Sequence, residues 1–223
     1  MKIKNFKQNF IAYFLFSAMI RIGLTGGIAS GKSTSLKIMR ELGCHTISSD
    51  DINDKLMKTN ASLRAQLKKE FNCIDESTGM VNKKMLGRIV FKDPVAKQKL
   101  ESLTHPYIRA VRKSFFEKCE EKGVRFAVCE SPLIFERSLM HEFDYTILIV
   151  APLDVKIDRF IKSGKGDQEK FFTISKNQFL DAKKTKHADY VIKNSKDIKH
   201  LKSEIERTLR EIEARHENAL NGD

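Results

Sequence analysis

The sequence has few cysteines and none of the spacings with which cysteines usually bind metals. Its four cysteines, at positions 44, 73, 119 and 129, form no C-x-x-C pair. This pattern argues against a cysteine-based metal site. Reduced thiols in a cytosolic protein are therefore the expected state.

The start of the chain lacks an apolar run that could cross a bilayer. Residues 10–16 are apolar and follow Lys2, Lys4 and Lys7, which superficially resembles a signal peptide. The run is too short to span a membrane, and it leads directly into the first strand pattern. We expect residues 1–18 to be an N-terminal extension, or a start set too far upstream, before a single cytoplasmic domain over residues 19–223. A membrane anchor is the less favoured alternative.

The charge balance is strongly positive. The 223 residues carry 41 Lys and Arg against 29 Asp and Glu, for a net charge of +12, and 41% of them are apolar. A chain of this length buries one sizeable core, with one or two small excursions. The excess of positive charge favours polyanionic ligands such as nucleotides, phosphorylated metabolites or nucleic acid. A lysine-rich solvated surface is the simpler explanation for most of it.

One glycine-rich stretch follows a short apolar run. Residues 26–33 read GGIASGKS and fit G-x-x-x-x-G-K-[ST], between a strand pattern at 20–24 and a helix pattern at 32–42. Glycines let successive N–H groups point at an anion, and the following helix adds its positive end. In such a loop Lys32 reaches the β- and γ-phosphates and the Ser33 hydroxyl binds Mg²⁺. The stretch predicts a site for a nucleoside triphosphate.

Strand and helix patterns alternate along the rest of the chain. After the loop we expect strands at 44–47, 125–129, 145–150 and 190–192, and helices at 155–161, 169–180 and 198–212. This order predicts an α/β fold, a parallel five-stranded sheet with helices on both faces. Residues 60–122 are mostly helical in pattern, with turn signals at Pro94 and Pro106, and are expected to protrude as a helical lobe.

Polar residues at strand and helix ends are candidates for chemistry. Asp50 follows the second expected strand, where it orients an acceptor hydroxyl or caps a helix. Glu130 ends the third strand, where it organises a metal ion or water, or is a solvated acid. His105 precedes a proline at an expected helix cap, and with Arg109 it forms a candidate site for an acidic or phosphorylated substrate. A structural hydrogen-bonding role is the alternative for His105.

Residues 162–186 contain lysines but no arginine. They form either a lid that brings positive charge over the phosphates or a solvated helix pair. The lysines are Lys162, Lys165, Lys170, Lys176, Lys183, Lys184 and Lys186.

Several motifs together resemble one family. They read LTGGIASGKST at 24–34, ISSD at 47–50, LGRIVF at 86–91, LTHPYIR at 103–109, ESPLIFE at 130–136 and ADYVIKN at 188–194. In this order and spacing the chain resembles the dephospho-coenzyme A kinase family, a nucleoside-monophosphate-kinase-like P-loop family. The resemblance implies a three-layer P-loop kinase fold and transfer of a phosphoryl group from ATP, with Mg²⁺, to dephospho-CoA. It implies no nucleic-acid partner and no stable membrane association.

The resemblance also assigns roles to residues. Asp50 and Lys32 are expected to be catalytic, and Ser33 is expected to bind the metal. Asp50, His105, Arg109 and Glu130 are expected to bind the substrate. The residues expected at the nucleotide are Gly27, Ile28, Ala29, Ser30, Gly31, Lys32, Ser33, Thr34 and Asn194, with Asn194 near the base.

The chain departs from the family pattern in two places. Ser48 stands where the family's turn usually has a first aspartate, and Ser163 and Thr173 stand where its lid has arginines. Lys162, Lys165 or Lys184 are the candidates to replace the arginines, as point charges rather than bidentate forks. Two other functions stay open. One is a kinase of another metabolite or nucleoside, and the other is a nucleotide-regulated nucleic-acid-binding or assembly protein, for which no recognition helix or arginine cluster is present.

Overall fold

The computed structural model describes residues 18–222, so the extension expected at 1–18 lies almost entirely outside the described residues. The chain forms two compact units. Of the described residues, the first unit combines 18–46 with 118–222, and the second spans Ile47–Glu117. Within residues 18–222, no helix combines the length and apolarity needed to cross a bilayer.

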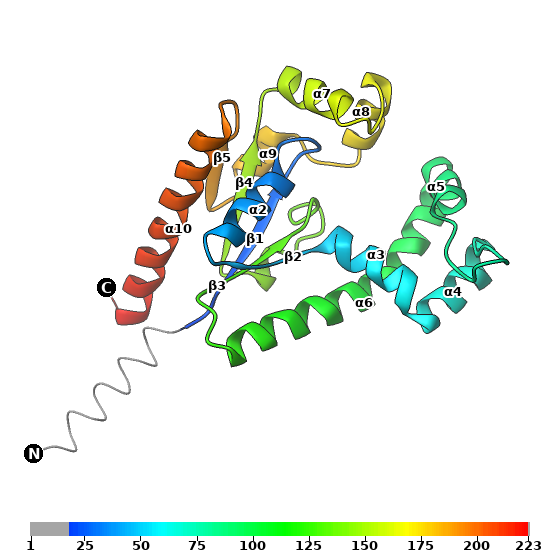
Figure 1. Cartoon of the computed structure of the whole chain (residues 1–223), viewed down its shortest axis with the longest axis horizontal. Helices are drawn as coiled ribbons and strands as arrows, with labels where there is room; N and C mark the ends of the chain where they lie inside the picture. Colours follow the sequence, from blue (N-terminus) through cyan, green and yellow to red (C-terminus); the bar gives the residue numbers. More distant parts are fainter. Residues whose placement is uncertain (1–17, 223) are drawn as a thin grey trace, which may run out of the picture. The chain divides into compact units, whose positions relative to one another are not determined.

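A five-stranded sheet is the centre of the first unit. In chain order the strands are β1 (Ile20–Gly26), β2 (His45–Ser48), β3 (Phe126–Glu130), β4 (Tyr145–Val150) and β5 (Tyr190–Lys193). Their order across the sheet is β2-β3-β1-β4-β5 (Figure 1). Strand β1 pairs in parallel with β3 and β4, and β4 pairs in parallel with β5. The predicted parallel α/β sheet is confirmed, with β1 at its middle.

Alternate residues of β1 pack against opposite faces of the sheet. Ile20, Ile22 and Leu24 are fully buried in the cluster that includes helices α2 (Lys32–Glu41) and α10 (Ile198–Asn221). Figure 1 shows α10, in red, lying along β5. On the other face, a Cβ at Gly23 would lie 2.7 Å from the ring of Phe143, so a loop segment closes tightly over β1 there. This packing fixes the strand whose end carries the glycine-rich stretch.

The helix predicted at 169–180 is wrong in its second half. Helix α7 (Leu153–Lys162) is followed by α8 (Gln168–Ser175), a turn, and the short α9 (Asp181–Thr185). The N–H of Phe179 donates to Glu136 Oε1 at 2.8 Å instead of to a carbonyl one turn earlier. Because this N–H is bound to a side chain outside the helix, the helix does not continue through Phe179. The sequence pattern does not indicate Glu136 as that partner.

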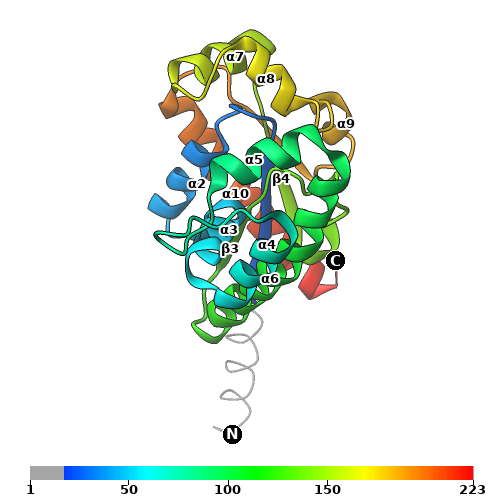
Figure 2. The same cartoon turned by 90° about the vertical axis from the view of Figure 1, so that its right-hand side faces the viewer.

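The second unit consists of helices around its own apolar cluster. They are α3 (Ser49–Thr59), α4 (Ala61–Phe71), α5 (Lys83–Lys92) and α6 (Pro94–Glu121), drawn in cyan to green in Figure 2. Leu56 of α3, Leu63 and Leu67 of α4 and Leu86 of α5 are buried together. The unit begins before the expected lobe boundary at residue 60, because α3 packs into the same cluster as α4.

The turn predicted at His105 and Pro106 is also wrong, because α6 runs through Pro106 without a break. Proline has no N–H to donate to the carbonyl of Ser102, and both residues are exposed, so water can satisfy that carbonyl. The Thr104 hydroxyl donates to the Leu100 carbonyl at 3.0 Å inside the same turn. His105 therefore lies inside a long helix and does not cap one.

Candidate active site

The glycine-rich loop joins β1 to α2 in a backbone path that side chains would block. Gly26 has φ 156° and Gly31 has φ 103°, both in the region that favours glycine. A Cβ on Gly26 would collide with the carbonyl oxygen of Ile149, and a Cβ on Gly31 would collide with the side-chain amide of Asn194. The loop is thus shaped by close contacts at both of its ends.

The positive end of α2 opens onto this loop. Gly31 is the N-cap residue and offers no side-chain cap, and the first turn of α2 holds no acidic side chain. Lys32 curls back so that its ammonium donates to the Gly27 carbonyl at 3.0 Å. Ser33 and Thr34 are exposed in the same turn. The arrangement presents backbone N–H groups, a lysine and two hydroxyls to an anion.

Two buried hydroxyls beside Gly26 lack hydrogen-bond partners. Among the described residues, Thr25 Oγ1 and Ser30 Oγ are fully covered and make no hydrogen bond. Buried polar atoms are nearly always paired, so such atoms call for an explanation. Their place at the loop fits a site built for a polar ligand.

Asn194 holds the loop in place. Its amide donates to the Ser30 carbonyl at 2.8 Å, and its backbone N–H donates to the carbonyl of Val150 at 2.7 Å. The side chain of Arg159 donates to the Asn194 carbonyl at 3.1 Å. Asn194 is 6% exposed, so its contacts link the ends of β4 and β5 to the loop. Sequence reasoning placed Asn194 at the nucleotide but missed Arg159, which had no motif to mark it.

Glu130 lies at the same edge of the sheet as the loop. It pairs in register with Leu24 of β1, and the next N–H, of Ser131, donates to the Leu24 carbonyl at 3.0 Å. Its side chain is 5% exposed, so the alternative of a solvated acid is wrong. Ligands of open parallel sheets bind at the carboxyl ends of the strands, which is where Glu130 stands.

The lysine-rich stretch is not uniformly solvated. Lys184 is fully buried, with its ammonium 2.9 Å from Glu136 Oε1 and 3.2 Å from the Pro132 carbonyl. Lys162 instead forms an exposed ion pair with Asp158 on its own helix, at 2.9 Å. The expectation of a solvated lysine is wrong for Lys184, which is held as a buried partner of Glu136.

Three further side chains reach the loop and were missed from sequence. Gln178, Asp181 and Lys156 all approach Gly27. Lys156 lies in the predicted helix 155–161, just ahead of the lysine-rich stretch. Gln178 lies within the helix predicted at 169–180, and Asp181 directly follows it. No motif marked either residue.

The structure places Asp50, His105 and Arg109 in the second unit. Asp50 is exposed in the first turn of α3, and Ser48 is its N-cap residue, so the alternative that Asp50 caps the helix is wrong. His105 and Arg109 are four residues apart in α6 and therefore share one face of that helix. Arg109 is exposed and His105 is half-buried.

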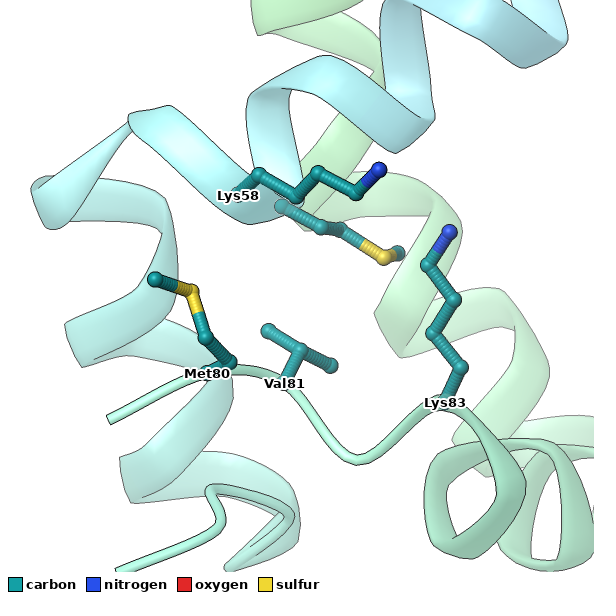
Figure 3. Close-up of a pocket in the computed structure, with 5 residues that line it drawn as sticks. Lys58, Met80, Val81 and Lys83 are labelled. Carbon is teal, nitrogen blue, oxygen red and sulfur yellow. The ribbon is translucent and has the colours of Figure 1, made fainter. Parts of the chain in front are cut away.

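The second unit also has an open pocket, of about 390 Å³. Its lining is apolar from Met57, Met80 and Val81, and Lys58 and Lys83 stand at its rim. Figure 3 shows both ammonium groups projecting to the same side of the opening. Lys83 is paired with Asp54 at 2.6 Å. No residue expected at the substrate lines this pocket.

A parallel sheet whose central strand ends in this loop, followed by an uncapped helix bearing Lys32 and Ser33, defines a P-loop nucleotide-binding fold. The family model described as dephospho-CoA kinase matches residues 20–200. The chain therefore belongs to the dephospho-CoA kinase family, and the resemblance seen in the sequence is confirmed. Members of this family take ATP as the phosphoryl donor.

Individual relatives agree with the family assignment. The chain is 31% identical to the dephospho-CoA kinase of Corynebacterium jeikeium, over 84% of this chain and 97% of the relative. It is 30% identical to that of Bartonella quintana, over 82% of this chain and 93% of the relative.

Solved structures show the same fold. A dephospho-CoA kinase from Campylobacter jejuni superposes with a TM-score of 0.64 at 29% identity, covering 87% of this chain and 97% of that chain. The protein TT1252 from Thermus thermophilus gives a TM-score of 0.76 at 26% identity, covering 86% of this chain and 97% of that chain. A shikimate kinase from Acinetobacter baumannii, 13% identical with a TM-score of 0.54 over 90% of this chain and 96% of that chain, shares the fold.

Proposed function

We propose that this protein transfers the γ-phosphoryl group of ATP to the 3′-hydroxyl of the dephospho-CoA ribose, producing CoA and ADP. The observation that carries the proposal is the geometry of the loop and α2 in a chain that matches the family over residues 20–200. The reaction needs a clamp for the nucleotide, neutralisation of charge and an oriented acceptor.

The loop residues hold the phosphates of the donor. Backbone N–H groups of the loop and the positive end of α2 bind the phosphate oxygens, and the Lys32 ammonium neutralises charge on the β- and γ-phosphates. The Lys32 ammonium lies at the loop, where it donates to the Gly27 carbonyl at 3.0 Å. Asn194 holds the loop through the Ser30 carbonyl, so it acts on binding by fixing the backbone.

The exposed hydroxyl of Ser33 and the carboxylate of Glu130 fit a magnesium ion bound with the nucleotide. Hydroxyl and carboxylate oxygens are the protein ligands that Mg²⁺ prefers, directly or through water. When bound, the ion neutralises charge on the phosphate oxygens. Ser33 contributes a hydroxyl from the first turn of α2, and Glu130 contributes a buried carboxylate at the end of β3.

Asp50 is the proposed acceptor for the proton of the ribose hydroxyl. The hydroxyl oxygen forms a bond to the γ-phosphorus while the bond from that phosphorus to the β–γ bridging oxygen breaks, and ADP leaves. The proton passes to the Asp50 carboxylate, which also orients the hydroxyl. Asp50 is exposed in the first turn of α3, where a substrate can reach its carboxylate.

His105 and Arg109 are proposed to bind dephospho-CoA. They share one face of α6, where an imidazole and a guanidinium can hold the phosphate oxygens of the acceptor. In this proposal the helical lobe expected at 60–122 receives the acceptor and residues 162–186 act as a lid. Residues 1–18 lie ahead of the catalytic domain, and the protein works in the cytoplasm on small-molecule substrates.

A panel of acceptors tests this function. ATP consumption is measured with dephospho-CoA, nucleosides and nucleoside monophosphates at equal concentrations. The proposal predicts ADP release with dephospho-CoA well above the others. Turnover with a nucleoside and none with dephospho-CoA would instead support a kinase of another metabolite on the same fold.

A further inference from the structure

Side chains from outside the loop crowd the α-carbon of Gly27. A Cβ placed there would lie 3.2 Å from Asp181 Oδ1, 3.5 Å from Lys156 Nζ and 3.8 Å from Gln178 Oε1. The same Gln178 oxygen accepts the backbone N–H of Ile28 at 2.9 Å. A loop amide suited to a phosphate oxygen is thus bound by a side-chain oxygen of the protein itself.

Lys156 and Asp181 form an ion pair at this spot. Lys156 Nζ lies 2.7 Å from Asp181 Oδ2, and the two side chains are only 13% and 24% exposed. Lys156 comes from α7, which follows β4, the neighbour of β1 in the sheet. A lysine ammonium on a flexible stem can change partners without any movement of its helix. The ammonium of Lys156 is therefore a positive charge beside Gly27 of the loop that can change its partner.

Other polar groups of the lid region are held elsewhere. The hydroxyls of Ser163 and Thr173, at the two positions where the family resemblance predicts arginines, donate to the carbonyls of Phe160 and Glu169 at 2.7 and 3.0 Å. Lys170 donates to the Lys165 carbonyl at 2.6 Å, and Lys184 is buried against Glu136. None of these contacts involves the loop.

We propose that Lys156 binds the phosphate chain of the nucleotide, and that Asp181 holds its ammonium beside the loop until the nucleotide arrives. Phosphate oxygens at the Ile28 amide take the place of the Gln178 oxygen and lie next to the Asp181 carboxylate. Like charges repel at that distance, so Asp181 moves away while Lys156 stays with the phosphates. The inference rests on the proposed function only in that the loop binds ATP; the acceptor plays no part in it.

Opposite effects of the two partners distinguish this exchange from a simple bridge between α7 and α9. Lys156→Gln removes a charge-assisted contact to phosphate and weakens ATP binding about tenfold. Asp181→Asn removes a competing and repelling carboxylate, so ATP binding becomes a few times tighter. If the pair only joined the two helices, the two substitutions would change binding in the same direction or leave it unchanged.

Calorimetric titration of the full chain with MgATP tests the proposal. The variants are Lys156→Gln, Asp181→Asn and, as a control, Arg207→Gln, which removes a positive charge from exposed ion pairs with Glu204 and Glu211 in α10. We expect weaker, tighter and unchanged binding respectively. Lys156→Gln with wild-type affinity, or Asp181→Asn weakened as much as Lys156→Gln, would overturn the proposal.

A double variant distinguishes a loss of the Lys156 charge from a loss of folding. Lys156→Gln with Asp181→Asn replaces the ion pair by two amides that can still hydrogen-bond across α7 and α9. Its ATP affinity should fall below that of Asp181→Asn alone, and an affinity equal to it would refute the role of Lys156. Turnover of dephospho-CoA by the wild-type protein is measured separately. If the wild-type protein turns over dephospho-CoA and Lys156→Gln binds MgATP with wild-type affinity, this inference alone is refuted. If the two substitutions change MgATP affinity in opposite directions but dephospho-CoA is not turned over, only the proposed acceptor is refuted.

Discussion

The ammonium of Lys184 lies 2.9 Å from Glu136 Oε1, and the lysine side chain is fully buried. The same carboxylate oxygen accepts the N–H of Phe179, so Glu136 ties the turn before α9 and α9 itself to one point. These contacts set the position of the segment that carries Gln178 and Asp181 to the loop. A buried ion pair thus positions the groups that meet the nucleotide.

Removing one partner of this pair should destabilise the protein strongly. Lys184→Met leaves the Glu136 carboxylate buried without its cation, and we expect the free energy of unfolding to fall by about 3–5 kcal/mol. Urea unfolding followed by circular dichroism measures it. Lys162→Met, which breaks an exposed ion pair, should change stability by less than about 1 kcal/mol. Equal losses in the two variants would contradict the buried role of Lys184.

The loop should lose affinity when Asn194 is shortened. Asn194→Ala removes the donor to the Ser30 carbonyl and frees the loop backbone, so we expect ADP binding to weaken by about tenfold. Calorimetric titration with ADP measures the change. Lys193→Ala, an exposed neighbour at the end of β5, is the control and should bind ADP normally. Unchanged affinity in Asn194→Ala would mean that the loop keeps its shape without this contact.

Asp50 and Asp51 give a matched pair for the chemical step. Both are acidic, exposed and in the first turn of α3, so both lie at the positive end of the helix. Asp50→Asn should bind ATP normally and lose about a hundredfold or more of kcat, because the acceptor hydroxyl loses its base. Asp51→Asn should keep nearly full activity. Steady-state kinetics with dephospho-CoA measures the kcat of both variants. Similar kcat values would show that Asp50 has a structural role and not a catalytic one.

Cys44 should be unreactive while the protein is folded. Burial raises the pKa of its thiol to about 12, so almost no thiolate forms near neutral pH. Iodoacetamide at pH 8 should leave Cys44 unmodified in the native protein and alkylate it in urea, as read by peptide mass spectrometry. Because the thiol ionises at lower pH in the unfolded chain, its contribution to stability is complete below about pH 9 and declines as pH rises towards 12. Rapid alkylation of native Cys44 would contradict its burial.

Local rules were enough to predict the sheet and the loop. The buried runs of β1 and β4 and the spacing from Gly26 to Ser33 depend on neighbouring residues, so the sequence displays them directly. The order of the strands and the family resemblance then gave the class of enzyme. Asn194 was found through its motif, although its contact with the loop could not be read from the chain.

Long-range partners explain what the sequence did not predict. The end of α8 depends on a hydrogen bond between Phe179 and Glu136, which are 43 positions apart. The continuity of α6 through Pro106 depends on an exposed carbonyl that water can satisfy. Lys156 meets Asp181 only because α7 and α9 approach the loop together, and no periodic pattern records such a meeting.

The product formed from dephospho-CoA tests the central claim most directly. Purified protein is incubated with MgATP and dephospho-CoA, and the product is examined by mass spectrometry and ³¹P NMR, with Lys32→Met protein as the inactive control. The account predicts CoA that carries the new phosphate on the 3′-oxygen of the ribose, together with an equal amount of ADP. ATP hydrolysis that leaves dephospho-CoA unchanged, or phosphate at another position, would contradict it.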